Sequence, residues 1–236
     1  MRKEVSPRLN TQKTDGLKGK WTELGSCLSK VSFAEIIADS RTGSIIVDLS
    51  EGTLDRLKID SSCKEQLSAY IFGANPIRHG GYMEQRNLYA GFPEYAYNSR
   101  DTHLGIDVWV AAKTPVFSPC DAKVHSVHNN EGKGNYGPTI ILKHMINDIC
   151  FYTLYGHLSL RGIEKVKKGQ TIRSGQIFSH TGEENENGGW PPHLHFQVIL
   201  DLLDNDTDFP GVCSQEDIKL YKLLCPDPNL ILRIQN

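Results

Sequence analysis

The sequence lacks clusters of basic residues, and its overall charge is nearly balanced. Lysine and arginine total 26 against 28 acidic residues in a chain of 236, and no window gathers five or six basic side chains. Proteins that bind nucleic acid or an anionic membrane surface usually present such a basic patch. We therefore expect no nucleic acid and no membrane among the partners of this chain.

Long hydrophobic runs are also missing. No stretch has the roughly 20 consecutive apolar residues that a membrane-spanning helix needs. Residues 1–21 begin with basic side chains but continue without the apolar core of a secretion signal. These two absences predict a protein that is not inserted in a membrane and that resides in the cytoplasm.

The six cysteines are scattered, and no two lie closer in sequence than Cys213 and Cys225. The sequence therefore has no CxxC motif, which excludes the usual cysteine-rich zinc sites and dithiol redox sites. Six thiols could form three disulfides, but a cytoplasmic chain of this length favours reduced and mostly buried cysteines.

The hydrophobic pattern divides a chain of ordinary globular composition into three regions. Residues 1–94 predict a small α/β extension, in which the polar residues 1–20 are expected to be loose. Residues 95–202 hold eight short β-type runs separated by turn residues, which predict a mainly β domain built as an antiparallel sandwich or barrel. Residues 203–236 predict a short helix followed by an extended tail, both packed on the core. The eight runs are GIDVWV, TPVFSP, AKVHSV, PTIILKH, ICFYTLYGHL, QTIRSG, QIFSHTG and HLHFQVIL.

Two histidines stand one residue apart in the apolar segment PPHLHFQV. Residues i and i+2 of a strand face the same side, about 6–7 Å apart, so His193 and His195 project into one shared space. A single histidine on a strand is usually structural. A pair of them, in a chain with other candidate ligands, favours a metal site.

The segment HLGID supplies further candidate ligands. His103 and Asp107 would lie about 13 Å apart on a regular strand, but Gly105 allows the chain to bend between them. Together with one histidine of the HxH pair, they offer zinc three nitrogen and oxygen ligands with one position left open, which is typical of a catalytic zinc site. The other histidine of the pair would stand beside the metal. His157, in FYTLYGHLSL, alternates onto one strand face with Tyr155 and is a candidate for a place beside this site.

Several motifs, in the same order along the chain, resemble those of the M23 family of zinc metallopeptidases, the lysostaphin and LytM type. The matching segments are HLGID, YGHLS and PPHLHFQV, together with TPVFSPCDAKV, GNYGPTIILKH and VKKGQTIRSGQIFSHTG. The resemblance covers residues 103 to about 199, under half of the chain. It implies the duplicated hybrid motif fold of that family.

The resemblance also implies roles for five residues. His103, Asp107 and His195 correspond to the ligands of Zn²⁺, and His157 and His193 to a pair of catalytic histidines. Zinc held by three ligands can polarise a carbonyl and acidify a water molecule. The unliganded histidines can then exchange protons with that water and with the leaving amine. The resemblance therefore predicts a zinc metalloendopeptidase-like hydrolase that cleaves a peptide or amide bond.

Tyr97 stands a little upstream of the first ligand, where some members of the family place a tyrosine that stabilises the oxyanion. The chain departs from the family pattern at Lys113 and Ala122, where glycine is usual, and this puts the local hairpin geometry in doubt. Typical members are exported and cut peptidoglycan cross-bridges, whereas this chain shows no export signal. We expect a peptide, muropeptide or small amide as its substrate.

Three alternatives to an M23 peptidase are considered. The first is a non-catalytic binding or activator module on the M23 fold, although such modules typically lack ligands that this chain retains. The second is a cytoplasmic hydrolase of small amides, because LYGHLSL, PPHLHFQVILDLL and LCPDPNLIL resemble M23-like segments of bacterial kinase and aminotransferase fusion proteins. The third is a phosphocarrier with paired histidines, which Asp107 disfavours. Bound metal and peptide turnover distinguish these alternatives.

Overall fold

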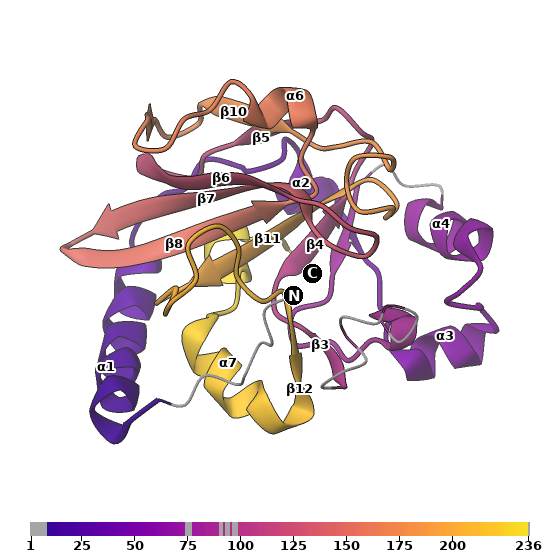
Figure 1. Cartoon of the computed structure of the whole chain (residues 1–236), viewed down its shortest axis with the longest axis horizontal. Helices are drawn as coiled ribbons and strands as arrows, with labels where there is room; N and C mark the ends of the chain where they lie inside the picture. The colour runs from indigo at the N-terminus through magenta and orange to yellow at the C-terminus, as the bar shows by residue number, and fades with distance from the viewer. Residues whose placement is uncertain (1–8, 74–76, 90–91, 93–94, 96–98, 236) are drawn as a thin grey trace.

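The computed structural model describes residues 9–73, 77–89, 92, 95 and 99–235. Within these residues the chain forms one large open sheet, two small sheets and short helices around them (Figure 1). The prediction of a mainly β fold is confirmed. The large sheet has free edges, so it does not close into the barrel that was one of the expected forms.

The large sheet has eight strands in the order β1-β2-β4-β11-β8-β7-β6-β9. Their bounds in that order are Ile45–Ile46, Arg78–Gly80, Ile106–Trp109, His193–Ile199, Ile149–Gly156, Gly137–Ile146, Ala122–Asn130 and Thr171–Ile172. All pairs in it are antiparallel except β1 with β2, which run parallel, so the sheet is mixed at this edge.

Two small sheets complete the β structure of the described residues. Strand β5 (Pro115–Phe117) pairs with β10 (Ile177–His180), and β3 (Arg100–His103) pairs with β12 (Val212–Ser214). The second pair joins the beginning of the predicted β domain to its C-terminal extension. All eight β-type runs of the sequence contain strands. Burial alternates along β6, as expected for a strand with one exposed face, whereas β4 and β11 are buried at every residue.

The described part of the N-terminal region includes the helices α1 (Thr11–Leu28), α2 (Ser40–Gly43), α3 (Glu51–Leu57) and α4 (Lys64–Phe72). Residues 11–20, expected to be loose, instead belong to α1. Asn10 caps this helix by accepting a hydrogen bond from Lys13 N, and Leu17, Leu24 and Leu28 are buried along one side. These three leucines stand far apart among polar residues, which is why the segment looks unstructured in sequence.

Short helices continue along the rest of the chain: η1 (Asn87–Tyr89), α6 (Leu160–Ile163), η2 (Gln215–Asp217), α7 (Ile218–Leu224) and α8 (Asn229–Leu232). Helix α1 lies against α7, α8 and β8, so the two ends of the described chain pack together (Figure 1). The predicted C-terminal helix is α7, and the tail after it forms α8 rather than an extended segment. No helix of the described residues is long and apolar enough to cross a membrane.

Two hydrophobic clusters hold the fold together. The main core includes the central strands and the buried side of α1, whereas a smaller cluster centres on Trp109 and is lined by Val47, Leu54, Leu67 and Ile71. Trp109 ends strand β4, which also carries Asp107. The N-terminal region is therefore packed on the strand that carries a candidate ligand.

Candidate metal centre

A bend between β3 and β4 brings His103 and Asp107 together. β3 ends at His103, β4 begins at Ile106, and the distance from His103 Nε2 to Asp107 Oδ1 is 3.3 Å. Gly105 lies at the bend, where an added Cβ would come within 2.7 Å of the His195 imidazole. Glycine is therefore needed at this position for close approach to the third side chain.

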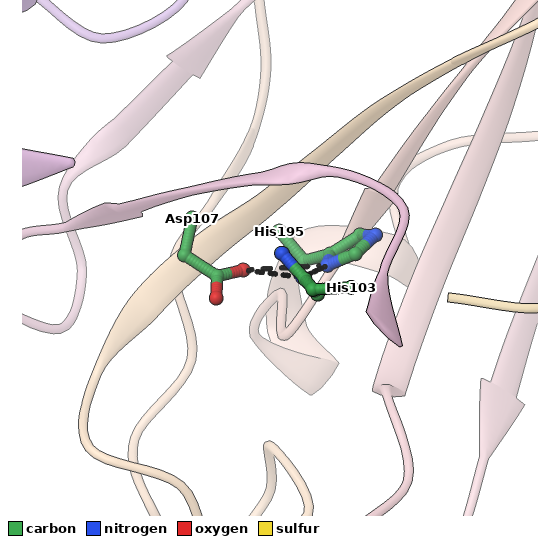
Figure 2. Close-up of side chains that lie close together, drawn as sticks. All are labelled: His103, Asp107 and His195. Carbon is green, nitrogen blue, oxygen red and sulfur yellow. Dashed lines mark hydrogen bonds and ion pairs between the residues drawn. The ribbon is translucent and has the colours of Figure 1, made fainter. Parts of the chain in front are cut away.

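His195 reaches the same point from strand β11. It lies opposite Asp107 in the antiparallel pairing of β11 with β4. Its Nδ1 is 3.3 Å from Asp107 Oδ1 and 2.9 Å from His103 Nε2 (Figure 2). The three side chains are buried, and their ligand atoms all lie within 4.8 Å of one another.

Hydrogen bonds on the outer side of both imidazoles fix which nitrogen carries the proton. His103 Nδ1 lies 2.9 Å from the carbonyl oxygen of Gly81 and must donate to it. His195 Nε2 lies 2.9 Å from Gln197 Oε1, and the Gln197 amide nitrogen donates to the carbonyl of Pro210. The two nitrogens that face each other, His103 Nε2 and His195 Nδ1, therefore both carry lone pairs.

Three acceptors thus converge without a donor between them. Asp107 Oδ1 is buried and has no hydrogen-bond partner. Burial alone would raise the pKa of Asp107, but the neighbouring His103 and the Arg86 guanidinium hold that pKa well below its usual range. Burial, together with Arg86, lowers the pKa of His103 to about 4. An ionised carboxylate facing two neutral imidazole lone pairs is a site for a cation.

The spacing of these atoms fits zinc. Tetrahedral zinc with bonds of about 2.0–2.2 Å separates its ligand atoms by about 3.3–3.6 Å. Two of the three distances in the cluster are 3.3 Å, and the third, between the two imidazole nitrogens, is 2.9 Å. His103, Asp107 and His195 could therefore hold one zinc ion and leave a fourth position free.

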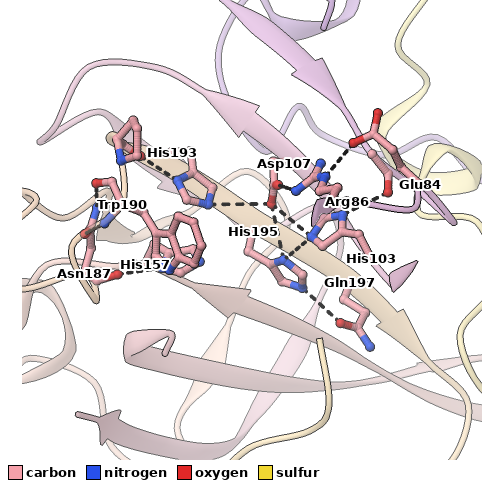
Figure 3. Close-up of polar contacts among 12 residues, drawn as sticks. Glu84, Arg86, His103, Asp107, His157, Asn187, Trp190, His193, His195 and Gln197 are labelled. Atoms are coloured by element: carbon pink, nitrogen blue, oxygen red, sulfur yellow. Dashed lines mark hydrogen bonds and ion pairs between the residues drawn. The ribbon is translucent and has the colours of Figure 1, made fainter. Parts of the chain in front are cut away.

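His193 and His157 lie on the other side of Asp107, with their rings 4.2 Å apart between centroids (Figure 3). His193 Nδ1 donates to the carbonyl of Pro191 at 2.7 Å, and His157 Nδ1 donates to the carbonyl of Asn187 at 2.8 Å. Each ring therefore keeps a lone pair on Nε2. His193 Nε2 points toward Asp107 Oδ1 at 3.7 Å. Burial lowers the pKa of both imidazoles, so both are neutral at neutral pH.

The backbone of His157 is in the left-handed region. Its φ is +58°, directly after strand β8 ends at Gly156. A non-glycine residue pays a conformational cost there and is often found at a functional site. Backbone hydrogen bonds on both sides hold the turn, since His157 N donates to Tyr136 O and its carbonyl accepts from Gly182 N. The turn aims the imidazole at His193.

Three residues that contribute to the site were not singled out by sequence reasoning. Arg86 binds Asp107, and the buried ring of Tyr136 lies 5.1 Å from that of His195 and 5.8 Å from that of His157. Asn187 positions His157 through its carbonyl oxygen. Tyr136 belongs to the GNYG motif and could have been found there, whereas no local pattern marks Arg86. Tyr97 lies outside the described residues.

Residues 101–206 match the model of peptidase family M23. This match confirms the family resemblance of the motifs, and the matched segment contains all three candidate ligands. None of the curated proteins matches the chain.

Solved structures with similarity to the chain include three peptidases. A zinc-containing peptidase from Vibrio cholerae is 30% identical over 46% of this chain, with a TM-score of 0.35, and the chain spans 31% of that protein. The catalytic domain of lysostaphin from Staphylococcus simulans is 23% identical over 61% of this chain and 88% of its own, with a TM-score of 0.37. The catalytic domain of the prophage-encoded M23 protein EnpA from Enterococcus faecalis is 22% identical over 59% and 92%, with a TM-score of 0.40.

Proposed function

We propose that this protein is a zinc-dependent peptidase or amidase that hydrolyses a peptide or amide bond. One observation carries the proposal. The lone pairs of His103 Nε2 and His195 Nδ1 converge on the partnerless Asp107 Oδ1, and no donor lies between them. The match of residues 101–206 to peptidase family M23 supports the same chemistry.

The metal would be held by His103, Asp107 and His195. Zinc bound there would supply a Lewis acid that polarises the scissile carbonyl and acidifies water. The outer hydrogen bonds from His103 to Gly81 and from His195 to Gln197 orient the imidazoles toward the metal before it binds.

His157 and His193 would move the protons of the reaction. Each has its Nδ1 proton held by a backbone carbonyl and a free lone pair on Nε2, so each can accept a proton at Nε2. The carbonyl that accepts from Nδ1 also stabilises the imidazolium that results. One of the two can take the proton from water at its Nε2, and the imidazolium that results can return that proton to the leaving amine. Tyr97 remains a proposed oxyanion donor.

The burial of the site favours a narrow substrate. None of the five histidine and aspartate residues has more than 5% of its surface exposed. A substrate that reaches them must be thin and extended, so we propose a short peptide, a muropeptide or a small amide rather than intact cell wall. A cytoplasmic location agrees with such a substrate, and cell fractionation tests it.

The deciding experiment is digestion of a panel of peptides, muropeptides and small amides, read out by mass spectrometry. The protein is assayed after metal removal, after addition of zinc, and as the Asp107→Asn variant. We expect cleavage only by the zinc-loaded unmodified chain. Equal cleavage by the chelated protein, or by zinc-loaded Asp107→Asn, would contradict the proposal.

A further inference from the structure

The two carboxylate oxygens of Asp107 lie in different surroundings. Oδ1 faces the histidines and has no donor, whereas Oδ2 accepts a hydrogen bond from Arg86 Nη1 at 2.6 Å. The ion pair is buried, with 3% of the Arg86 side chain and 4% of the Asp107 side chain exposed. Arg86 therefore occupies the oxygen that a metal could otherwise also bind (Figure 3).

Arg86 is itself fixed by several contacts. Its Nε pairs with Glu84, its Nη1 also donates to the Tyr89 hydroxyl at 3.2 Å, and its backbone N–H donates to the carbonyl of Asp101 at 2.8 Å. Glu84 in turn accepts a hydrogen bond from Leu49 N at 3.0 Å. The guanidinium cannot move away from the carboxylate of the candidate site without breaking this buried network.

The segment that carries Arg86 also positions His103. The carbonyl of Gly81 accepts from His103 Nδ1, and the carbonyl of Glu84 accepts from His103 N at 2.9 Å. Gly81 has a φ of +105°, and an added Cβ there would lie 1.8 Å from Arg86 Nη2. Glycine alone allows the arginine and the histidine to approach this turn together. One segment thus orients two of the three candidate ligands.

We propose that Arg86 is a positioning residue that restricts Asp107 to a single coordinating oxygen and thereby sets the affinity and coordination of the metal centre. This inference rests on the proposed zinc function. A guanidinium holds its N–H donors in one rigid plane, which a lysine ammonium does not reproduce. Partners of metal ligands typically contribute about 10- to 100-fold to metal affinity.

The first test compares zinc affinity, measured by competition with a chromophoric chelator, in the unmodified chain, Arg86→Gln and Arg86→Lys. We expect a loss of about 10- to 100-fold for Arg86→Gln. Arg86→Lys should fall between that variant and the unmodified chain, since it restores charge without the planar donors. Arg173→Gln is the matched control, because Arg173 pairs with Asp121 on the exposed surface, and its affinity should equal that of the unmodified chain.

The second test separates positioning from a general effect on folding. Cobalt is substituted at saturating concentration, so that every folded molecule carries metal, and the visible absorption is recorded. Freeing the second oxygen of Asp107 raises the coordination number, so Arg86→Gln should lose absorption intensity relative to the unmodified chain and Arg173→Gln. A purely structural role for Arg86 would leave the spectrum of the saturated protein unchanged.

Each outcome has a defined meaning. Failure of the unmodified chain to bind zinc would overturn both the proposed function and this inference. Zinc affinity and cobalt spectra of Arg86→Gln that equal those of the unmodified chain would overturn the role of Arg86 alone. If Arg86→Gln does not fold, Arg86→Lys and Glu84→Gln are measured instead. Glu84→Gln keeps the guanidinium of Arg86 but removes its ion pair with Glu84. Unchanged affinity and spectra in both would equally overturn the role.

Discussion

Two buried histidine environments in this protein differ in how many of their ring nitrogens have hydrogen-bond partners within the fold. His144 on β7 is 1% exposed, stacks on Phe151, and has partners at both nitrogens. Its Nδ1 lies 3.2 Å from the carbonyl of Asp121, and its Nε2 lies 2.7 Å from Thr153 Oγ1. At the candidate metal centre each imidazole has a hydrogen-bond partner at only one nitrogen. The other nitrogen carries a lone pair that receives no hydrogen bond.

The difference shows that burial does not identify a functional histidine. Burial lowers the pKa of both His144 and His193, so this property does not separate the two environments. The number of ring nitrogens with hydrogen-bond partners does separate the two environments. His144 has no capacity left for a metal or a proton transfer, because its donor and its acceptor are both used within the fold.

The candidate metal centre and the surroundings of His144 should differ most when the carboxylate of Asp107 is removed. Asp107→Asn keeps the shape of the side chain but takes away its charge, so we expect loss of bound zinc and of turnover by about 1,000-fold or more. His144→Gln should keep one zinc ion per chain. Elemental analysis and the peptide assay measure both. Full zinc occupancy in Asp107→Asn would show that other residues hold the metal.

Within the candidate site, substitutions should separate the proposed proton-transfer histidines from the proposed metal ligands. His157→Ala and His193→Ala each remove a proposed proton-transfer group, which typically contributes about 100- to 10,000-fold to the rate. Zinc should stay bound in both variants, because neither imidazole belongs to the proposed ligand set. Turnover and zinc content are measured on the same preparations. A variant that loses its zinc would instead assign that histidine to the metal.

The pH dependence of the free energy of unfolding should show that the fold keeps His144 neutral. Burial lowers its pKa to about 4, whereas an unfolded histidine titrates near 6.5, so the unfolded chain binds the proton at the higher pH. The resulting stability is present above about pH 6.5 and is lost as the pH falls toward 4, with a total on the order of 3 kcal/mol.

Denaturant unfolding of the unmodified chain and of His144→Gln between pH 4.5 and 7.5 measures this contribution. The free energy of unfolding of the variant should fall less steeply with decreasing pH. The metal-free form of both proteins is used, so that zinc binding does not add its own pH dependence. Parallel curves would show that His144 is not held neutral by the fold.

The smallest predicted effect concerns the left-handed backbone at His157. Asparagine tolerates positive φ better than alanine, so His157→Asn should be more stable than His157→Ala by about 1 kcal/mol. Thermal unfolding of the metal-free variants measures the difference. The same pair of substitutions at the exposed strand residue His128 is the control and should show no advantage for asparagine. Equal stability at position 157 would mean that the turn relaxes.

Local sequence patterns predicted the β domain and the main candidates of the site. Period-two alternation placed His193 and His195 on one strand face, and Gly105 marked the bend that joins His103 to Asp107. These inferences needed only residues close together in the chain. The left-handed φ of +68° at Lys113 also shows that the hairpin keeps a geometry that favours glycine without having one there.

The sequence by itself determined the residue types and which strand residues share a face, which is why the candidate ligands, the HxH pair and the strands could be proposed from it. Tertiary structure decided which nitrogen of each imidazole faces the metal site, because that depends on the distant carbonyl of Gly81 and the amide of Gln197. It also decided that Arg86 lies behind Asp107 and that α1 forms. Apart from the contact between His195 and Gln197, which are two residues apart, these contacts join segments far apart in the chain, and their stability comes from burial that no local pattern contains.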